Sequence, residues 1–359
     1  MSRVFTVAVV GGGIGRSHII EGYKPNADRF RVLAVCDLDP ARMNGLADEF
    51  GIERRVADFD ELLAMDDLDI IDICTPPMVH YPMIMAALAA GKHVICEKPL
   101  VGSLQQIDEV IAAERRAKGR LMPVFQYRFG NGIQQAKAII DAGLAGKPFV
   151  GTVETLWRRE PDYYAVPWRG KWKTELGGVL MGHAIHPHDM FCYLMGPLRS
   201  LYGRVATRVN AIEVEDCISA SVELESGALG SFTATLGSAD EITRIRLAFE
   251  NLTIESDHSP YNPGAAPWKV LPRNEATREA IAALLSGWRD VPPRFTTQMA
   301  RFHEALTKGT PLPVTTADSR RALEIVTAFY YSSRTHQEVA FPIGRDHPNY
   351  ASWLPEGMA

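Results

Sequence analysis

The sequence predicts an α/β protein: an N-terminal doubly wound parallel sheet, followed by a C-terminal α/β domain with a large, mainly antiparallel open sheet. Three observations lead to this fold class. Near the amino terminus a continuous apolar strand runs into a glycine-rich turn, at residues 7–15. Strands and helices then alternate up to about residue 125. Beyond about residue 148 the pattern changes to successive strands in which apolar and polar positions alternate.

Length and composition limit the class of protein. A chain of 359 residues is too long for one ordinary hydrophobic core, so we expect two domains. With 46% hydrophobic residues, 23% charged residues and a net charge of −5, nothing favours a nucleic-acid or membrane partner. The first predicted strand starts close to Met1 and no apolar run approaches the roughly 20 residues that span a bilayer, so we expect a cytoplasmic protein without a signal peptide. The five cysteines include no C-x-x-C pair and are expected to be small buried residues.

The first domain is expected to cover residues 1–125. Helices are predicted at about 16–23, 40–50, 78–90 and 103–118, and further strands at 30–36, 68–74, 93–96 and 121–125. Asp39 and Ser103 are the expected amino-terminal caps of two of these helices, and Pro40 takes the first helical position after Asp39. Because strands separated by such helices form a parallel sheet, ligands should bind at the carboxyl ends of the strands.

The second domain is expected to cover residues 126–359. Strands are predicted at 150–156, 198–208, 217–224, 228–236, 243–249 and 252–255, and late helices at about 296–308 and 319–332. Gly227 and Gly237 are expected to form hairpin turns, and Asp318 to cap the last helix. One face of the sheet should be covered, and the late helices are candidates to pack back on the first domain. Residues 260–272, rich in Pro, Gly and Ala, are expected to be a loop.

The glycine-rich turn predicts a nucleotide site. Glycines directly after a buried strand let the backbone turn tightly and approach a ligand, and a dinucleotide pyrophosphate would bind there. The spacing is one residue short of G-x-G-x-x-G, since counting from Gly11 places Arg16 at the third glycine. The next strand ends at Asp37, whose carboxylate can accept hydrogen bonds from the adenosine ribose. The alternative is a structural turn followed by a strand-terminal Asp.

Short segments along the chain resemble one family in their order and separation. They are Thr75-Pro76-Pro77-Met78-Val79-His80, Glu97-Lys98-Pro99, Gln126-Tyr127-Arg128-Phe129, Gly143-Leu144-Ala145-Gly146-Lys147 and Thr310-Pro311-Leu312-Pro313-Val314-Thr315. Over nearly its whole length the chain resembles the Gfo/Idh/MocA oxidoreductases, the family of glucose–fructose oxidoreductase and inositol dehydrogenase. The resemblance implies a Rossmann domain, then an α/β domain whose open sheet supports homo-oligomer contacts, and sugars, polyols or related alcohols as substrates.

Lys98 is the first candidate catalytic residue. It follows a parallel strand at the edge where ligands bind, and a partly desolvated ammonium group can transfer a proton or stabilise a developing alkoxide. The family resemblance also implies a catalytic lysine here, in its Glu-Lys-Pro signature. The alternative is a surface lysine paired with Glu97.

The histidine-rich segment 177–189 resembles the family's second catalytic stretch. His186 aligns with the family's histidine that exchanges a proton with the substrate hydroxyl. The family often has Asp four residues earlier, where this chain has Gly182, so His183 is a candidate substitute or substrate ligand. On a helix, His183 and His186 would face the same side. The alternatives are structural histidines at His183 and His188, or a metal site formed with the neighbouring Asp, which we do not expect because His188 lies off the shared face.

An aromatic and basic segment, residues 157–172, lies between the two catalytic stretches. It contains Trp157, Trp168 and Trp172, and basic side chains stand beside them. Aromatic faces suit the C–H faces of a sugar ring, and guanidinium groups suit hydroxyls or carboxylates. Core packing or a subunit interface would use the same aromatic side chains.

These features predict an NAD-dependent dehydrogenase that oxidises a secondary hydroxyl of a sugar, glycoside or inositol-like cyclic polyol. Lys98 and His186 would handle the hydroxyl proton, and no metal is expected. NAD is expected over NADP, because Asp37 would repel a 2′-phosphate and Leu38 adds no positive charge, although Arg42 lies nearby in sequence. The alternatives are a reductase of an imine, enal or other unsaturated substrate, and a non-catalytic dinucleotide-binding regulator.

The expected binding residues follow from the motifs and the resemblance. The cofactor residues are Gly11, Gly12, Gly13, Ile14, Gly15, Asp37, Thr75, Pro76, His80, Glu97, Lys98 and Gln126. The substrate residues are Lys98, Arg128, Tyr164, Trp168, Arg169, His183 and His186. The expected partners are a sugar or polyol and further copies of the chain, through the C-terminal sheet.

Overall fold

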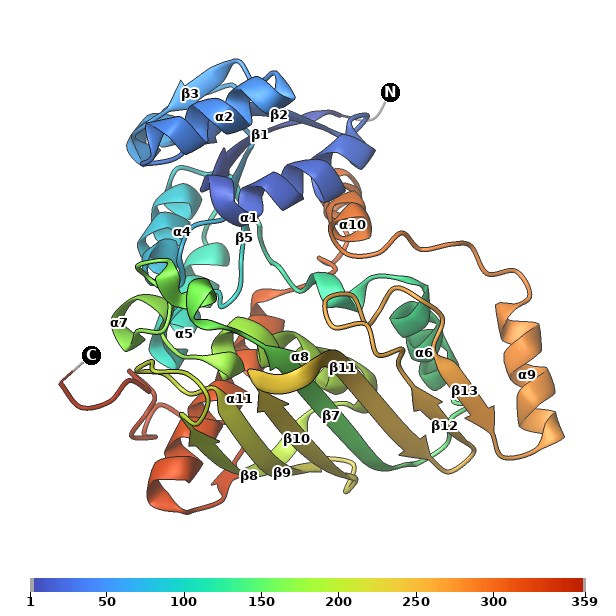
Figure 1. Ribbon diagram of the computed structural model, residues 1–359. Coiled ribbons are helices and arrows are strands. Elements are labelled where there is room, and N and C mark those ends of the chain that lie inside the picture. The colour runs from blue at the N-terminus through green and yellow to red at the C-terminus, as the bar shows by residue number, and fades with distance from the viewer. Residues whose placement is uncertain (1–2, 358–359) are drawn as a thin grey trace. The chain divides into compact units, whose positions relative to one another are not determined.

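The computed structural model describes residues 3–357. The chain forms two compact units, each containing helices and strands (Figure 1). The first consists of the described residues up to Val124 together with Phe295–Arg320, and the second of Phe125–Arg294 together with the described residues from Arg321 onward. The predicted α/β class, with one parallel and one mainly antiparallel sheet, is confirmed. Within residues 3–357, no helix is long and apolar enough to cross a membrane.

A six-stranded parallel sheet forms the centre of the first unit. Its strands are β1 (Phe5–Val10), β2 (Phe30–Cys36), β3 (Arg54–Val56), β4 (Ile70–Ile73), β5 (His93–Cys96) and β6 (Leu121–Pro123). They lie in the order β3-β2-β1-β4-β5-β6, so the strand order reverses between β1 and β4. In open sheets of this kind, the crevice at the carboxyl ends of such a pair binds the ligand. Strand β3 was not predicted, because its three residues contain no apolar run.

The helices of the first unit agree in most places with the predicted segments. They are α1 (Gly12–Ser17), the π-helix η1 (His18–Tyr23), the 3₁₀ helices η2 (Lys24–Asn26) and η3 (Pro77–Val79), and α2 (Pro40–Phe50), α3 (Phe59–Leu63), α4 (His80–Ala89), α5 (Leu104–Glu114) and α10 (Phe295–Lys308). Both predicted caps are confirmed: Asp39 accepts from the N–H of Ala41, and Ser103 from that of Gln106. The predicted start of the first helix, near Arg16, is wrong, since the chain turns at Gly11 and becomes helical at the next residue.

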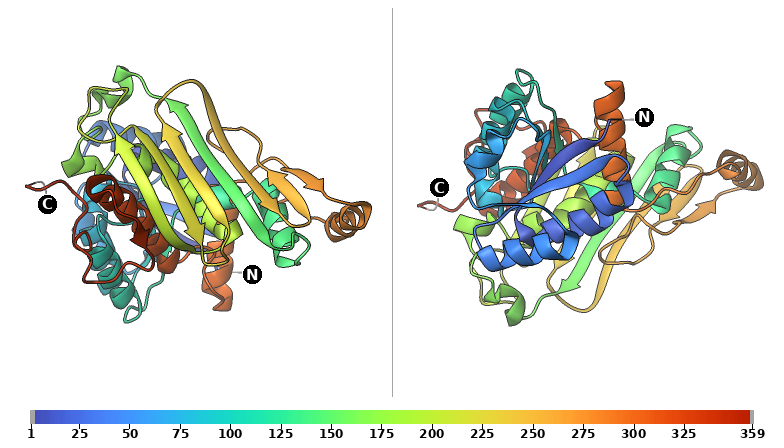
Figure 2. Two further views of the ribbon diagram at one scale, coloured as in Figure 1. Left: turned by 90° about the horizontal axis from the view of Figure 1, so that it is seen from below. Right: turned by 90° about the horizontal axis from the view of Figure 1, so that it is seen from above.

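The second unit is built on an eight-stranded sheet. Its strands are β7 (Pro148–Arg158), β8 (Leu198–Ala206), β9 (Cys217–Leu224), β10 (Leu229–Thr235), β11 (Gly237–Phe249), β12 (Leu252–Glu255), β13 (Lys269–Pro272) and β14 (Val339–Ala340). The left panel of Figure 2 shows the central strands side by side. They lie in the order β13-β12-β11-β7-β10-β9-β8-β14, and among these neighbours β7 and β10 pair in parallel while the others are antiparallel.

One face of this sheet is buried, as predicted. Ala220, Phe232 and Val153 lie opposite one another on β9, β10 and β7, and all three are buried. Their neighbours along each strand point to the other face, which is mostly exposed. The helices of this unit are η4 (Gln126–Arg128), α6 (Asn131–Asp141), η5 (Pro161–Ala165), α7 (Trp172–Glu175), the π-helix η6 (Leu180–Ala184), α8 (Ile185–Met195), α9 (Glu275–Leu285) and α11 (Thr316–Thr335), the last beginning in the first unit.

Two turn and loop predictions in this unit are wrong. Residues 260–272 are not a loop throughout, because 269–272 form β13 and pair with β12; this edge strand is largely exposed and has no buried apolar run to reveal it. Gly237 is not a hairpin turn but the first residue of β11, where it pairs with Arg158 of β7. The turn at Gly227 is confirmed, with a φ of 82° between β9 and β10.

The predicted cap of the last helix is also wrong. The helix α11 begins at Thr316, so Asp318 lies within its first turn. The Oγ1 of Thr315 accepts from the N–H of Asp318 at 3.3 Å, and Oδ2 of Asp318 accepts from the N–H of Thr315 at 2.8 Å. This reciprocal capping box uses Asp318 as the second partner of the cap rather than the cap itself.

Candidate active site

The glycine-rich turn joins β1 to α1 in the first unit. Gly11 has a φ of 97°, and a Cβ at this position would lie 2.7 Å from the carbonyl oxygen of Cys74. A Cβ on Gly15 would lie 2.6 Å from Cγ1 of Val9, so this glycine lets the helix pack directly on the strand. A Cβ on Gly13 would meet nothing within 4 Å. The turn is therefore tight on both sides and open at Gly13, which fits the approach of a pyrophosphate to its backbone.

Asp37 directly follows β2, and its carboxylate is buried. Its Oδ2 accepts from the N–H of Gly12 at 2.7 Å, and its Oδ1 accepts from the N–H of Asp39 at 2.9 Å. The guanidinium of Arg42 lies 3.3 Å from Asp37 and 3.4 Å from the carboxylate of Asp39. Strand β2 thus ends in a fixed carboxylate next to the glycine turn, the arrangement that suits ribose hydroxyls.

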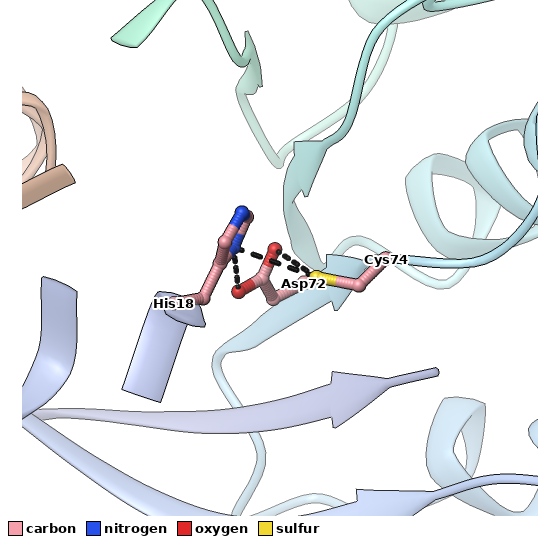
Figure 3. A group of neighbouring side chains, drawn as sticks. All are labelled: His18, Asp72 and Cys74. Carbon is pink, nitrogen blue, oxygen red and sulfur yellow. Dashed lines mark hydrogen bonds and ion pairs between the residues drawn. The ribbon is translucent and has the colours of Figure 1, made fainter. Parts of the chain in front are cut away.

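A buried cluster of polar side chains lies at the ends of β4 and β5, and Figure 3 shows three of its members. Nδ1 of His18 lies 2.8 Å from Oδ2 of Asp72, and its Nε2 lies 3.0 Å from Oε1 of Glu97. The hydroxyl of Tyr23 donates to Asp72 at 2.7 Å, and Sγ of Cys74 is 3.4 Å from Nδ1 of His18. Neither His18 nor Asp72 was predicted as a site residue, although Asp72 is a charged residue inside an apolar strand.

The charges in this cluster compensate one another. Burial by itself would lower the pKa of His18, but Asp72 raises it well above its ordinary value. Burial would raise the pKa of Glu97, but the hydrogen bond and charge of His18 hold it below its ordinary value. Burial raises the pKa of the Cys74 thiol, which therefore stays protonated. His18, Asp72 and Cys74 lie close enough to surround a cation, but a protonated imidazole and a thiol are poor metal ligands.

Lys98 follows directly after this cluster. Its backbone N–H donates to Oε2 of Glu97 at 3.1 Å, and its peptide bond to Pro99 is cis. The side chain of Glu97 is held in turn by His18. A continuous set of buried contacts therefore supports the turn that carries the half-buried Lys98.

His80 connects two strand-end turns of the first unit. Its Nδ1 lies 2.8 Å from the carbonyl oxygen of Pro99, and its Nε2 lies 2.8 Å from that of Thr75. The ring is fully buried, and burial lowers the pKa of His80. The predicted cofactor residues Thr75 and Pro76, by contrast, are half-exposed. In this structure His80 positions the two turns.

The predicted site residues from Gln126 onward belong to the second unit, whereas the glycine turn, Asp37 and Lys98 belong to the first. Gln126 lies in η4 and is buried, and its Oε1 has no hydrogen-bond partner. Arg128, in the same short helix, binds Asp189 of α8 through a bidentate ion pair, with Nε–Oδ2 of 2.6 Å and Nη2–Oδ1 of 2.5 Å.

The predicted catalytic stretch that contains the histidines is anchored by Glu215, which no sequence motif marked. Oε1 of Glu215 accepts from the N–H groups of Gly178 and Leu180, at 2.9 and 3.0 Å, and its Oε2 accepts from the hydroxyl of Tyr330 at 2.8 Å. Burial raises the pKa of Glu215 to about 7. No motif marks Glu215, because it lies 35 residues beyond Leu180 in the chain.

His183 and His186 have different neighbours. The ring of His183, in η6, meets the edge of Trp157 at 5.1 Å between ring centres, and its Nε2 lies 3.3 Å from the hydroxyl of Tyr163. The ring of His186, in α8, stacks on Tyr127 at 4.5 Å. His183 precedes the α-helix and sits in a π-helical turn, whose wider spacing changes the directions of successive side chains.

His188 and Asp189, the other two residues of the candidate metal site, contact other side chains. His188 stacks on Phe232 at 4.3 Å between ring centres, and burial lowers the pKa of His188 to about 3. Asp189 is paired with Arg128. His188 therefore packs in the core, and Asp189 forms an ion pair.

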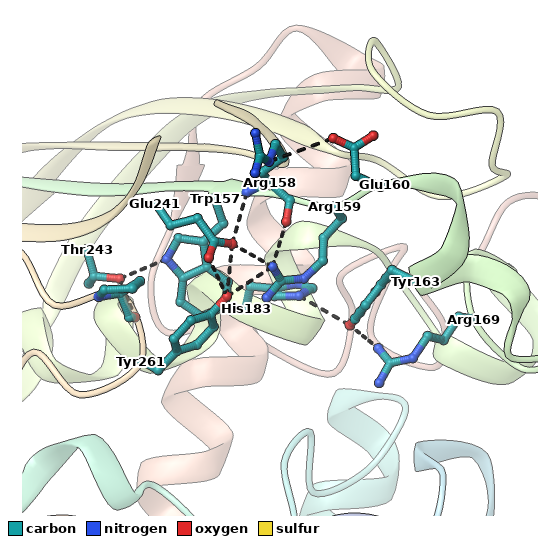
Figure 4. A network of polar contacts seen from close by, with 11 residues as sticks. Trp157, Arg158, Arg159, Glu160, Tyr163, Arg169, His183, Glu241, Thr243 and Tyr261 are labelled. Atoms are coloured by element: carbon teal, nitrogen blue, oxygen red, sulfur yellow. Dashed lines mark hydrogen bonds and ion pairs between the residues drawn. The ribbon is translucent and has the colours of Figure 1, made fainter. Parts of the chain in front are cut away.

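The aromatic and basic segment divides into core and surface parts. Trp157 is buried, and its Nε1 donates to Oγ1 of Thr243 at 3.1 Å. Arg169 donates to the hydroxyl of Tyr163 and stacks on Trp168, 4.5 Å from the centre of its ring (Figure 4 shows Arg169 and Tyr163). Trp157 therefore packs in the core, as one alternative held, whereas Trp168 and Arg169 are half-buried.

Glu175 brings a carboxylate next to Gly182. Its Oε2 accepts from the N–H of Gly170 at 2.5 Å, and its Oε1 lies 3.9 Å from Nη1 of Arg169. A Cβ built on Gly182 would lie 3.8 Å from the same Oε1, which is ordinary van der Waals contact. The residue lies seven positions before Gly182, on α7, so the sequence spacing did not reveal it.

The fold and the first-unit site define a Rossmann-fold dinucleotide-binding protein. Residues 5–125 match the oxidoreductase family with an NAD-binding Rossmann fold, and residues 133–255 match the GFO/IDH/MocA C-terminal domain. The chain belongs to the GFO/IDH/MocA family of NAD-binding oxidoreductases, as the motifs predicted.

Similar proteins include oxidoreductases of known and unknown substrate. The chain is 32% identical over 238 residues to the uncharacterized oxidoreductase YrbE of Bacillus subtilis, covering 64% of this chain and 66% of that protein. It is 30% identical to the myo-inositol 2-dehydrogenase of Thermotoga maritima, covering 53% and 54%. These matches therefore span between half and two thirds of the relatives. The WlbA dehydrogenase of Bordetella pertussis, solved with NADH and UDP-GlcNAcA, is 25% identical with a TM-score of 0.83, covering 95% of this chain and 100% of that one.

Proposed function

We propose that the protein is an NAD-dependent dehydrogenase that oxidises a secondary hydroxyl of a sugar, glycoside or cyclic polyol. The observation that carries this proposal is the support of Lys98 at the end of β5, through the contacts from Asp72 to His18 to Glu97. The similarity to an inositol dehydrogenase, and to a dehydrogenase solved with a nucleotide sugar, favours a substrate of this class.

Each residue has a separate task in this reaction. NAD, when bound, accepts the hydride of the carbinol carbon. The turn at Gly11–Gly15 would hold its pyrophosphate, and Asp37 would accept from its adenosine ribose. Lys98 would donate a hydrogen bond to the reacting oxygen and stabilise its negative charge, while His186 would take the proton. Stacking on Tyr127 fixes the orientation of the His186 ring.

Glu175 would replace the carboxylate that the family often places where this chain has Gly182. It lies beside Gly182, it is buried, and it already binds the backbone of Gly170. A buried carboxylate near the histidine stretch can hold the protonated form of a histidine during turnover.

The experiment is a substrate screen with two variants. NADH formation is followed with inositols, aldohexoses, glycosides and a short-chain alcohol, and the best substrate is expected among the cyclic polyols and sugars. Lys98→Ala and His186→Ala should each lower kcat by roughly 10²-fold or more, while the Kd for NAD from calorimetry stays nearly unchanged. Activity should also survive exhaustive chelation.

The matched controls are Lys118→Ala and His258→Ala, which remove an exposed lysine and an exposed histidine from the same units. Both should keep the activity of the parent protein. Near-normal turnover in Lys98→Ala or His186→Ala would remove that residue from the mechanism. Turnover of an imine or enal, with every sugar and polyol inert, would overturn the dehydrogenase proposal.

A further inference from the structure

The hydroxyl of Tyr163 meets the predicted histidine stretch of the second unit (Figure 4). Tyr163 lies in η5 and is half-buried. Its hydroxyl oxygen lies 3.3 Å from Nε2 of His183, and Nη1 of Arg169 donates to the same oxygen. Both contacts are partly buried, so the hydroxyl lies at the border between the protein interior and the solvent. No role was predicted for Tyr163, although the neighbouring Tyr164 was predicted to contact a substrate.

The two partners of this hydroxyl determine where its proton points. A guanidinium can only donate hydrogen bonds, so the phenol oxygen accepts from Arg169 and keeps its own proton for another acceptor. Nε2 of neutral His183 is that acceptor, and this hydrogen-bond network assigns the proton of the imidazole to Nδ1. The hydroxyl of Tyr163 is thus oriented by a donor on one side and by an acceptor on the other.

His183, which was predicted as a substrate ligand, is enclosed by comparison. The residue is 5% exposed, its Nδ1 is buried and its Nε2 faces Tyr163. The edge of its ring also packs against Trp157, at 5.1 Å between ring centres. The imidazole is therefore placed to hold Tyr163, and the phenol is the more accessible member of this pair.

Two guanidinium groups fix the ring of Tyr163. The Cζ atom of Arg169 lies 3.9 Å from the centre of the ring, and that of Arg159 lies 5.0 Å from it. Arg159 is held in turn by Glu241, which accepts from its Nη1 at 2.8 Å. Arg169 lies 3.9 Å from the carboxylate of Glu175. A hydroxyl on a ring that is held in advance loses little freedom when a ligand binds.

We propose that Tyr163 contacts the substrate in place of His183, and that it binds a sugar or polyol hydroxyl other than the one that is oxidised. His183 is then a positioning residue, which acts through Tyr163. Sugar hydroxyls both donate and accept, and the phenol can match either: it accepts with a lone pair, or it turns its O–H from His183 towards the ligand. Because the oxidised hydroxyl is assigned to Lys98 and His186, the inference rests on the proposed function.

Calorimetry of the NAD-loaded protein tests this contact, with myo-inositol, D-glucose and methyl β-D-glucoside as probes. Tyr163→Phe keeps the ring and removes the hydroxyl. We expect it to weaken binding of the tightest probe by roughly tenfold and to change the Kd for NAD by less than about twofold. The monodeoxy analogues of that probe are then titrated into both proteins. For one analogue, the parent protein and Tyr163→Phe should bind equally weakly, because the contact is already lost with the ligand hydroxyl.

A variant of His183 separates the contact from its support. His183→Gln should weaken binding of the same probe by roughly fivefold in the parent protein, but by less than about twofold in the Tyr163→Phe background. If His183 bound the substrate directly, the two losses would multiply, and the assignment of the contact to Tyr163 would be overturned.

Tyr202→Phe is the matched control, because Tyr202 is an exposed tyrosine of β8 in the same unit. It should bind the probes like the parent protein, and thermal unfolding confirms that each variant is folded. Unchanged binding in Tyr163→Phe, an equal loss for the probe and for every monodeoxy analogue, or no binding of any of the three probes would each overturn the inference. NADH formation is measured separately: probe binding that depends on Tyr163 without any oxidation would contradict the proposed function and support this contact.

Discussion

At the level of single residues, we propose that Asp37 decides between the two nicotinamide cofactors. A ribose with two hydroxyls can donate to its carboxylate, whereas a 2′-phosphate would place further negative charge beside it. Arg42, the cation closest in sequence, is already shared between Asp37 and Asp39. The guanidinium of Arg42 thus helps to hold the carboxylate that we propose as the acceptor for the ribose.

We predict that NAD binds more tightly than NADP, and that Asp37→Asn lowers the NAD preference by roughly tenfold or more. The amide oxygen of Asn can still accept from the N–H of Gly12, so the variant removes the charge and keeps this bond to the glycine turn, whereas the N–H of Asp39 loses its acceptor. Titration calorimetry with both cofactors measures the ratio. The prediction fails if the parent protein binds NADP as tightly as NAD.

Glu175 and Gly182 form a second pair that can be tested at the level of single residues. Glu175→Gln keeps an acceptor for the N–H of Gly170 but loses the charge, so we expect kcat to fall by roughly tenfold or more. Adding Gly182→Asp should restore much of the activity, because a side chain at position 182 starts 3.8 Å from Oε1 of Glu175.

Gly182→Ala in the Glu175→Gln background is the control, since it adds a Cβ without a carboxylate. It should not restore turnover. Rates are compared with the best substrate of the screen, and thermal unfolding confirms that each variant is folded. Equal recovery with Ala and Asp would show that the carboxylate at this place does not act in the reaction.

At the level of elements, α8 combines two functions. Its first turn carries His186, and the helix packs its other side chains against the buried face of the second sheet. A Cβ on Gly151 or on Gly230 would meet the ring of Phe191. Because glycine has no Cβ, the helix can pack closely on the sheet at these two positions. His188 stacks on Phe232 of β10. The position of His186, the proposed proton acceptor, therefore depends on how the same helix packs in the core.

His188 should make the stability depend on pH. Burial lowers its pKa to about 3 in the folded chain, against about 6.5 in the unfolded chain. Below pH 6.5 the unfolded chain takes up a proton that folded His188 does not bind, so the free energy of unfolding falls as the pH drops. From pH 7 to pH 5 this residue should account for a loss of about 2 kcal/mol.

Chemical denaturation of the parent protein and of His188→Phe at pH 7 and pH 5 measures this contribution. The loss between the two pH values should be smaller in the variant by about that amount, whatever the variant's stability at pH 7. His188→Leu provides a second, smaller apolar side chain in case Phe overpacks the site. An identical pH dependence in all three proteins would contradict a neutral, buried His188.

At the level of the whole molecule, the exposed face of the second sheet favours association with further copies of the chain. Leu229 of β10 lies opposite Val150 of β7, and these side chains are 57% and 45% exposed. Tyr202 of β8 is 39% exposed. Large apolar side chains on an open sheet are often covered by a partner, and we propose a homo-oligomer that uses this face.

Leu229→Glu combined with Val150→Glu should therefore shift the protein towards the monomer. Light scattering after size-exclusion chromatography measures the mass, and thermal unfolding checks the fold of the subunit. Leu271→Glu, on the edge strand β13, is the control for an exposed leucine outside that pair. An unchanged mass in the double variant would place the interface elsewhere or exclude it.

The sequence by itself determined the buried strands, most helices of the first unit and the cofactor class. Buried strands, caps and the glycine turn are local patterns, because hydrophobic periodicity and backbone conformation depend on neighbouring residues. Asp37 and Lys98 could be found because each directly follows a strand that the pattern reveals. Edge strands such as β13 were missed because they bury little and leave no such pattern.

Only the tertiary structure decided which side chains support these residues and what surrounds them. His18 reaches Asp72 across 54 positions and Glu97 across 79, and Arg159 reaches Glu241 across 82. Such contacts depend on how distant elements pack, and burial then sets their charges and hydrogen-bond needs. Spacing along the chain has no fixed relation to that packing, so no local pattern could have shown it.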